Sequence, residues 1–193
     1  VRKPENTFIK TLSLDDLKGN LFPPHWDNFK SIFDSEQWQN ITGPQGWLKK
    51  SPQGMYDWYN PIVMSKMFML NDASIYNTFN TDYFYWIDAG LNITVHEGIL
   101  TDSEIYEKLP ALTDPFLFLS FPYKPAGEIH GFDQTEAERI TQKPIEYVCR
   151  GGLFGGHREF IGSANATYYS LLQVTLAGGF MGTEETLFTI MSY

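Results

Sequence analysis

The sequence has little cysteine, a deficit of positive charge and no long apolar run. Its single cysteine, Cys149, excludes an internal disulfide, and no Cys/His spacing typical of a zinc site occurs. The 14 Lys and Arg stand against 23 Asp and Glu, which gives a net charge of −9. This charge disfavours nucleic acid and anionic membranes as partners, and no run of residues is apolar enough for a membrane segment. The sequence does not indicate an oligomeric state.

Aromatic and other apolar residues are plentiful. Hydrophobic residues make up 42% of the 193 positions and aromatic residues 16%, so the chain has the material for a large core. Disordered segments are poor in aromatic residues, and disorder is therefore excluded for most of the chain. The length predicts a single domain over residues 1–193.

Strand-like and helical segments alternate along the chain. Helices are predicted at His25–Trp38, Asn60–Tyr76, Ser103–Leu109, Arg158–Ala177 and from a cap at Thr183 through Ser192. Strands are predicted at Thr7–Leu12, Asp82–Ile87, Phe116–Phe121 and Ile145–Cys149. This alternation predicts an α/β sandwich with a largely parallel or mixed sheet.

Asp88 stands at the end of a predicted buried aromatic strand and precedes two small residues. Ligands in open α/β sheets gather beyond the carboxyl ends of strands. A carboxylate in that position can hold Mg²⁺ or Mn²⁺ together with phosphate oxygens. A strand-end aspartate that caps a turn explains the same pattern equally well.

The segment Arg150–His157 (RGGLFGGH) is rich in glycine but matches neither a dinucleotide-binding fingerprint nor a P-loop. Its glycines are Gly151, Gly152, Gly155 and Gly156. Such a run allows tight turns or a close approach of backbone to a ligand. His157 follows at a predicted helix start, where it is a metal ligand, a phosphate contact or a surface residue at a helix cap.

Two adjacent carboxylates, Glu184 and Glu185, stand at the start of the last predicted helix. The helix dipole stabilises them there, so capping alone accounts for them. The functional interpretation is a carboxylate base that deprotonates a hydroxyl nucleophile.

Further candidates have weaker patterns. Trp58 and Tyr59 precede a predicted buried helix, where they can stack on a sugar or base or cover a core edge. His96 and Glu97 follow Asp88 closely and either line the same cleft or form a polar loop.

Four sequence blocks resemble the HtrL/YibB (WlaTC-type) family of glycosyltransferases and occur in that family's order. They are YNPIVMSKMFMLNDA (Tyr59–Ala73), FYWIDAGL (Phe84–Leu91), GGLFGGHREF (Gly151–Phe160) and GTEETLF (Gly182–Phe188). The resemblance extends over roughly Trp47 to Tyr193, about three quarters of the chain.

The resemblance implies a nucleotide-sugar-dependent transferase with a GT-A, Rossmann-like, three-layer α/β sandwich and a mixed, mostly parallel sheet. The donor is a nucleotide-diphosphate sugar, the acceptor a glycan or another hydroxyl, and Mn²⁺ or Mg²⁺ assists. A complete GT-A domain opens with a strand–helix–strand unit, so we expect that this chain lacks its first strand–helix unit or is part of a longer chain. A bacterial or viral origin implies the cytoplasm, and a eukaryotic origin implies the Golgi lumen.

By the same resemblance, Asp88 takes the place of the metal-binding carboxylate of a DxD-type motif. Only one carboxylate is present in Ile87–Gly90, so either metal dependence is in question or another ligand such as His157 completes the site. Glu184 or Glu185 is the base. The glycines at 151, 152, 155 and 156, and Trp58, contact the donor.

The rival interpretation is a non-catalytic carbohydrate-binding or scaffolding module that retains the fold. A metal-dependent phosphoesterase is third, because two metal ions need more clustered Asp and His than the sequence has.

Overall fold

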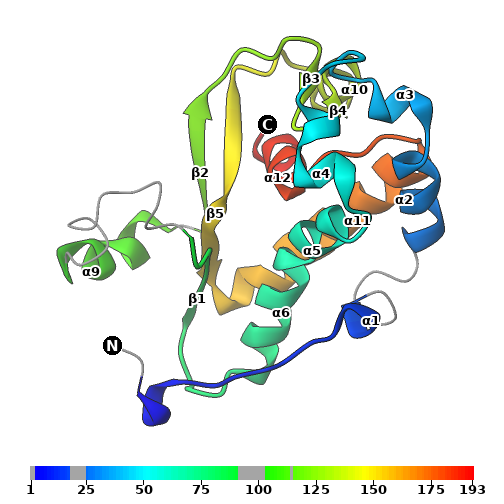
Figure 1. The fold of residues 1–193 in the computed structure, drawn as a ribbon. Coiled ribbons are helices and arrows are strands. Elements are labelled where there is room, and N and C mark those ends of the chain that lie inside the picture. The colour runs from blue at the N-terminus through cyan, green and yellow to red at the C-terminus, as the bar shows by residue number, and fades with distance from the viewer. Residues whose placement is uncertain (1–2, 18–24, 91–102, 114) are drawn as a thin grey trace.

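A three-stranded antiparallel sheet forms the centre of the fold (Figure 1). The computed structural model describes residues 3–17, 25–90, 103–113 and 115–193. The strand order is β1 (Tyr83–Ile87), β5 (Tyr147–His157), β2 (Phe116–Pro122). Because β5 is antiparallel to both neighbours, β1 and β2 run in the same direction without being paired.

The predicted parallel pairing is wrong for the described strands. The strands β1 and β2 do share a direction, and α9 (Ser103–Leu112) lies between them in sequence. The long strand β5 inserts between them. Its second half is the glycine-rich run, which was expected to form tight turns or to approach a ligand, so the strand predicted at Ile145–Cys149 is too short. The α/β class itself is confirmed.

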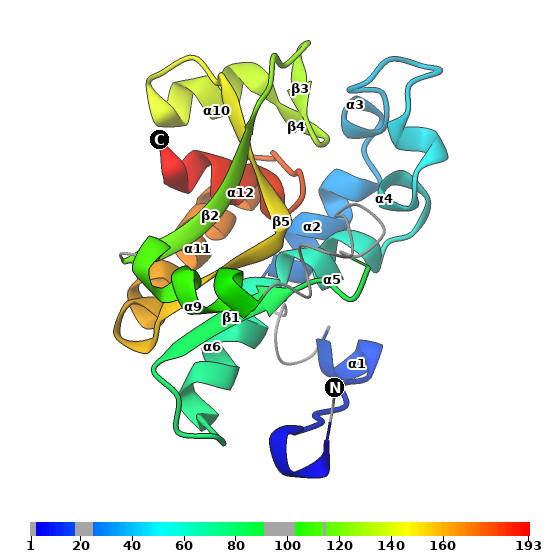
Figure 2. The same cartoon turned by 90° about the vertical axis from the view of Figure 1, so that its left-hand side faces the viewer.

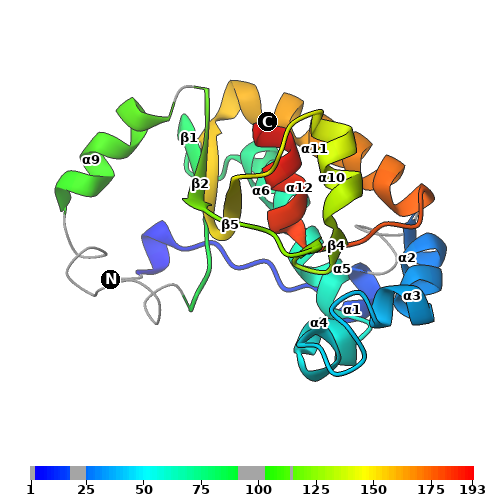
Figure 3. The ribbon, with the colours of Figure 1, turned by 90° about the horizontal axis from the view of Figure 1, so that it is seen from above.

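Helices cover the sheet unequally. Figures 1 and 3 show α6 (Lys66–Tyr76), α11 (Arg158–Ala177) and α12 (Glu184–Ser192) on one side of the sheet and α9 on the other. The core lies between the sheet and the first three helices. Phe154 on β5, Tyr168 on α11 and Phe188 on α12 are fully buried there. The ring of Phe188 lies 4.5 Å from that of Phe154 and 5.3 Å from that of Tyr168.

A small hairpin lies beyond the end of the sheet at which β2 ends and β5 begins (Figure 2). Its strands β3 (Glu128–Ile129) and β4 (Phe132–Asp133) are followed by α10 (Gln134–Thr141). His130 and Gly131 form the turn, and both have positive φ values of 51° and 86°. Two such residues suit a tight two-residue hairpin turn. This turn positions His130 at the edge of the candidate functional site.

The remaining helices are short. They are η1 (Pro4–Asn6), α1 (Leu14–Asp16), α2 (Trp26–Phe33), α3 (Glu36–Gln39), η4 (Leu48–Lys50), α4 (Pro52–Met55) and α5 (Tyr59–Met64). Among the described residues, the structure contains no helix with the length and apolar character needed to cross a membrane.

Some predicted elements are divided or absent. The long helix predicted at 60–76 is α5 followed by α6, and the buried Ser65 separates them, its hydroxyl donating to the Pro61 carbonyl at 2.6 Å. The helix predicted at 25–38 divides into α2 and α3, because Ser35 caps the start of α3. Its hydroxyl oxygen accepts a hydrogen bond from the Trp38 N–H. Residues 7–12 form no strand. The predicted bounds of α11 are confirmed.

Glycine is required in β5 because three strands approach closely. At Gly155, φ is 151°, and a Cβ there would overlap the Phe84 carbonyl and lie 2.7 Å from Cα of Tyr85. At Gly156, a Cβ would lie 2.7 Å from the Pro115 carbonyl oxygen. These two glycines therefore serve strand pairing rather than ligand contact.

Gly155→Ala is expected to lower the free energy of unfolding by roughly 2–4 kcal/mol, because the substitution adds a backbone collision to an unfavourable φ. Gly179→Ala is the matched control. Gly179 also has a positive φ, 84°, but nothing lies within 4 Å of the added methyl, so we expect a loss of about 1 kcal/mol. Urea unfolding of both variants measures the difference, and equal losses would contradict this explanation.

Candidate functional site

Segments far apart in the sequence meet at the carboxyl end of β1. Asp88 follows β1, and its N–H donates to the carbonyl of Gly152 on β5 at 3.0 Å. Lys66 is the first residue of α6, and Glu184 is the first residue of α12. The Lys66 ammonium donates to Oδ2 of Asp88 at 2.9 Å and to Oε1 of Glu184 at 2.7 Å. Asp88 and Glu184, two of the carboxylates that the sequence singled out, are therefore joined by a lysine.

The Lys66 ammonium is fully engaged by protein groups. Its third contact is the carbonyl of Gly151 at 3.4 Å, so its three N–H donors face three oxygens. The side chain is only 10% exposed. Its Nζ lies 5.9 Å from the centre of the Trp86 ring, and the Trp86 indole N–H donates to Oδ1 of Asp88 at 2.6 Å. Both oxygens of Asp88 are thus held.

A bulge in β5 shapes this centre. Pairing with β2 jumps from Phe118–Phe154 to Leu119–Arg150, so residues 151–153 bulge out of the ladder. Bulges commonly redirect groups next to functional sites. Here the bulge turns the Gly151 carbonyl toward Lys66. A Cβ on Gly151 would overlap the Glu184 carboxylate, so glycine makes room for that side chain.

Glu185 points toward a second set of polar groups. Its Oε1 accepts the Gly151 N–H at 2.9 Å, and its Oε2 lies 3.5 Å from Nη1 of Arg150. Nε2 of His130 lies 3.2 Å from the same Oε2, but without hydrogen-bond geometry. The β3–β4 turn carries His130, and Gln53 holds that turn by donating to the His130 carbonyl at 2.7 Å. Burial lowers the pKa of His130, so its ring is neutral beside Glu185 near pH 7.

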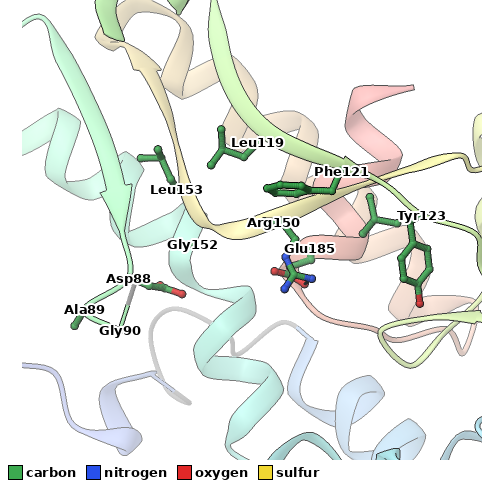
Figure 4. A pocket seen from close by; sticks show the side chains of 11 residues that line it. Asp88, Ala89, Gly90, Leu119, Phe121, Tyr123, Arg150, Gly152, Leu153 and Glu185 are labelled. Carbon is green, nitrogen blue, oxygen red and sulfur yellow. Dashed lines mark hydrogen bonds and ion pairs between the residues drawn. The ribbon is translucent and has the colours of Figure 1, made fainter. Parts of the chain in front are cut away.

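Two adjoining cavities open onto these residues and share Asp88, Arg150 and Glu185. The first, about 530 Å³, is walled by polar groups of the Lys66 centre and by Tyr59. The second, about 680 Å³, has an apolar wall that includes Phe121. In Figure 4, Arg150 and Glu185 lie together between Asp88 and Tyr123, and Phe121 of β2 lies beside them. Both volumes are typical of small-molecule sites.

The residues around Asp88 do not fit a divalent cation in this arrangement. The Lys66 ammonium stands between the two carboxylates that would have to supply ligands. Within the described part of the chain, no three Asp, Glu, His or Cys side chains are grouped so that they could hold one metal ion.

His157 does not join Asp88. Its partner across the sheet is Tyr83, five residues before Asp88, and five strand residues span about 17 Å. His157 instead caps α11, with Nδ1 accepting the Glu159 N–H at 3.4 Å. The expectation that His157 completes the sphere of Asp88 is corrected, because the two residues follow opposite ends of the β1–β5 pair.

The other predicted residues divide between the site and the scaffold. Gly151 and Gly152 lie at the Lys66 centre, whereas Gly155 and Gly156 serve strand pairing. Trp58 stacks on Tyr56 with the ring centres 5.0 Å apart, outside both cavities, and its neighbour Tyr59 lines one of them. His96 and Glu97 lie outside the described residues.

Sequence reasoning missed Lys66, Arg150 and His130. Lys66 did give a signal, because it is the single charged residue in an otherwise apolar helical segment before Asp72. A lysine on a buried helix needs a partner, and here it has two. Arg150 begins the glycine-rich segment at 150–157 but was given no role there, and His130 offered no comparable pattern.

Burial raises the pKa of Glu184 to about 7, and the neighbouring Lys66 opposes this rise without cancelling it. For Lys66, burial lowers the pKa, but the charges and hydrogen bonds of Glu184 and Asp88 outweigh it and the net shift is upward. Lys66 therefore stays charged, and Glu184 changes its protonation near neutral pH.

This pKa gives the stability a predictable pH dependence. A carboxyl group whose pKa is raised on folding stabilises the folded state below its unfolded pKa, and this stabilisation is lost as the pH rises to the folded value. Compared with Glu184→Gln, the wild type should lose about 3 kcal/mol of stability between pH 4.5 and pH 7.5. Urea unfolding of both proteins across this range is the measurement. A wild-type stability that stays constant or rises with pH relative to Glu184→Gln would contradict the assignment.

A comparison with protein families matches residues 26–193 to the family described as bacterial protein of unknown function, HtrL_YibB. The match covers the whole of the site described above. No curated protein and no solved structure matches the chain significantly.

Proposed function

The chain belongs to the HtrL_YibB family, and on that premise we propose that it is a glycosyltransferase of the GT-A type. It would move a sugar from a nucleotide-diphosphate sugar to a hydroxyl of a glycan or another acceptor. One observation carries the proposal. All four blocks that resemble glycosyltransferases contribute to one centre, through Lys66, Asp88, Gly151 and Glu185.

The architecture is compatible with this proposal. The sheet has helices on both sides, as a three-layer α/β sandwich requires, and the site lies beyond the carboxyl end of a strand. The GT-A assignment is part of the proposal. It predicts a mostly parallel sheet, whereas the described strands pair antiparallel.

Arg150 is the residue best placed for the donor phosphates. Its side chain is 52% exposed, lines both cavities and contacts Glu185 only at 3.5 Å. A guanidinium has five N–H donors in a planar fork that matches two phosphate oxygens. It would stabilise the negative charge that develops on the nucleoside diphosphate as the sugar leaves.

Glu185 is better placed than Glu184 to accept the acceptor proton. Glu184 is 4% exposed and bound to Lys66, whereas Glu185 lines both cavities. The Gly151 N–H holds one oxygen of Glu185 and leaves the other turned toward Arg150 and His130. A carboxylate so oriented can serve as a general base on an acceptor hydroxyl. The apolar wall with Phe121 offers a surface for a sugar face.

Thermal unfolding with a panel of nucleotide diphosphates and nucleotide sugars, with EDTA and with Mn²⁺, tests the proposal. A ligand that binds only the folded chain stabilises it by about 2.7 kcal/mol at a hundredfold excess over its Kd. We expect the nucleotides that carry one particular base to raise the thermal unfolding midpoint of the wild type. The substitution Arg150→Gln is expected to abolish this rise. Arg139→Gln is the matched control, because Arg139 is an exposed arginine paired with Glu136. No rise for any nucleotide would contradict the proposal.

A carbohydrate-binding module without turnover is the second candidate. It is favoured by the hydrogen bonds that Lys66 and Trp86 donate to the two oxygens of Asp88, which reduce the capacity of that carboxylate to bind a donor complex. Hydrolysis of the stabilising nucleotide sugar, even when slow, separates the two, because a binding module releases no nucleotide.

A further inference from the structure

The contacts of Lys66 have the composition of a cation site. Its three N–H groups meet the carboxylates of Asp88 and Glu184 and the carbonyl of Gly151, at 2.9, 2.7 and 3.4 Å. Carboxylate and carbonyl oxygens are also the ligands that Mg²⁺ and Mn²⁺ take in proteins. The three oxygens come from β1, α12 and the β5 bulge, so separate parts of the fold converge on one positive charge.

We propose that the Lys66 ammonium permanently takes the place of a divalent cation between Asp88 and Glu184, so that the centre works without metal. Lys66 is then a positioning residue, because its donors are spent on the protein. What this means for the substrate rests on the proposed function: the donor diphosphate binds in the absence of metal and meets Arg150 instead.

The surroundings of Lys66 make displacement by a cation unfavourable. The residue begins α6 and is 8% exposed, and three protein oxygens hold its ammonium in place. A divalent cation placed among the same oxygens would stand next to the ammonium and be repelled. Trp86 engages the other oxygen of Asp88 and restrains that carboxylate from turning toward a second position.

Removing Lys66 should therefore create the metal site that the wild type lacks. Lys66→Met keeps the length of the side chain and deletes the charge, which frees the oxygens of Asp88, Glu184 and Gly151. Lys30→Met is the matched control, because Lys30 forms an exposed ion pair with a single carboxylate, Asp34, at 2.8 Å.

The experiment is a titration with Mn²⁺ alone, followed by electron paramagnetic resonance of the free ion. We expect wild type, Asp88→Asn and Lys30→Met to take up no stoichiometric Mn²⁺. Lys66→Met is expected to bind about one ion per chain and to gain thermal stability from it, and the double variant Lys66→Met, Asp88→Asn to lose both effects. A folded Lys66→Met that binds no Mn²⁺ would overturn the proposal.

If Lys66→Met does not fold, the Mn²⁺ titration of the wild type still tests whether Lys66 takes the place of a divalent cation. Stoichiometric Mn²⁺ uptake by wild type that is lost in Asp88→Asn would overturn the proposal. The panel of nucleotides distinguishes failure of the role proposed for Lys66 from failure of the proposed transferase function. Nucleotide binding that needs Mn²⁺ would overturn the role of Lys66 and leave the transferase standing. Absence of all nucleotide binding would remove the transferase, while the Mn²⁺ titration still decides the role of Lys66.

Discussion

Lys66→Met is expected to lower the free energy of unfolding by about 3–5 kcal/mol, because it leaves the buried Glu184 carboxylate without its counter-ion. Lys66 has an exposed side-chain fraction of 10% and Glu184 one of 5%, so water compensates little for the lost contacts. Deleting the ammonium also leaves the Gly151 carbonyl unpartnered. Urea unfolding near pH 7.5, where Glu184 is mostly ionised, measures the loss.

Two further variants test whether the loss comes from unbalanced charge. Adding Glu184→Gln to Lys66→Met removes the stranded carboxylate and should recover a large part of the stability, since replacing both members of a buried pair is often nearly neutral. Lys30→Met breaks the exposed pair with Asp34 and should cost less than about 1 kcal/mol. If the double variant is as unstable as Lys66→Met, packing rather than charge explains the effect.

Glu185→Gln is expected to reduce sugar transfer by roughly 10²–10⁴-fold, the usual contribution of a general base. Glutamine keeps an oxygen that can accept the Gly151 N–H, so the bond at 2.9 Å and the start of α12 can persist. The substitution removes the negative charge that faces Arg150 and His130 and the capacity to take a proton. Release of nucleotide from the sugar donor that stabilises the wild type is the measurement.

The thermal midpoint and nucleotide binding of Glu185→Gln should stay close to those of the wild type, because the donor phosphates are assigned to Arg150. Glu159→Gln is the matched control. Glu159 stands at the start of α11, as Glu185 does near the start of α12, but its side chain is 71% exposed and far from the cavities. Full activity in Glu185→Gln would contradict its role as the base and return that role to Glu184.

Part of the site was predictable from local sequence. Asp88 stands at the end of an aromatic strand, and Glu184 and Glu185 stand at a helix start after Thr183; both positions place a carboxylate at the edge of an element. The glycine-rich run was correctly associated with the site only in its first half. Gly151 borders Glu184, while the space at Gly155 is taken by the backbone of β1.

The bridging role of Lys66 was not predictable in the same way. Its charge within an apolar helix indicates that a partner must exist, because an unpaired buried ammonium is costly. Which carboxylates serve as partners depends on how α6, β1 and α12 pack, and these elements are separated by 22 and 118 residues at the contacts. His130 depends likewise on a hairpin turn that reaches the site from elsewhere in the chain.

The sequence by itself determined the α/β class, the bounds of α11, most of β1 and β2, and the positions of the strand-end and helix-start carboxylates. These features depend on periodicity and capping, which act between residues close in the chain. Only the tertiary structure decided that β5 pairs antiparallel between β1 and β2, that its bulge faces Lys66, and that Lys66 bridges Asp88 and Glu184. Those outcomes depend on the pairing of distant backbone groups and on the charges that burial brings together, neither of which has a local pattern.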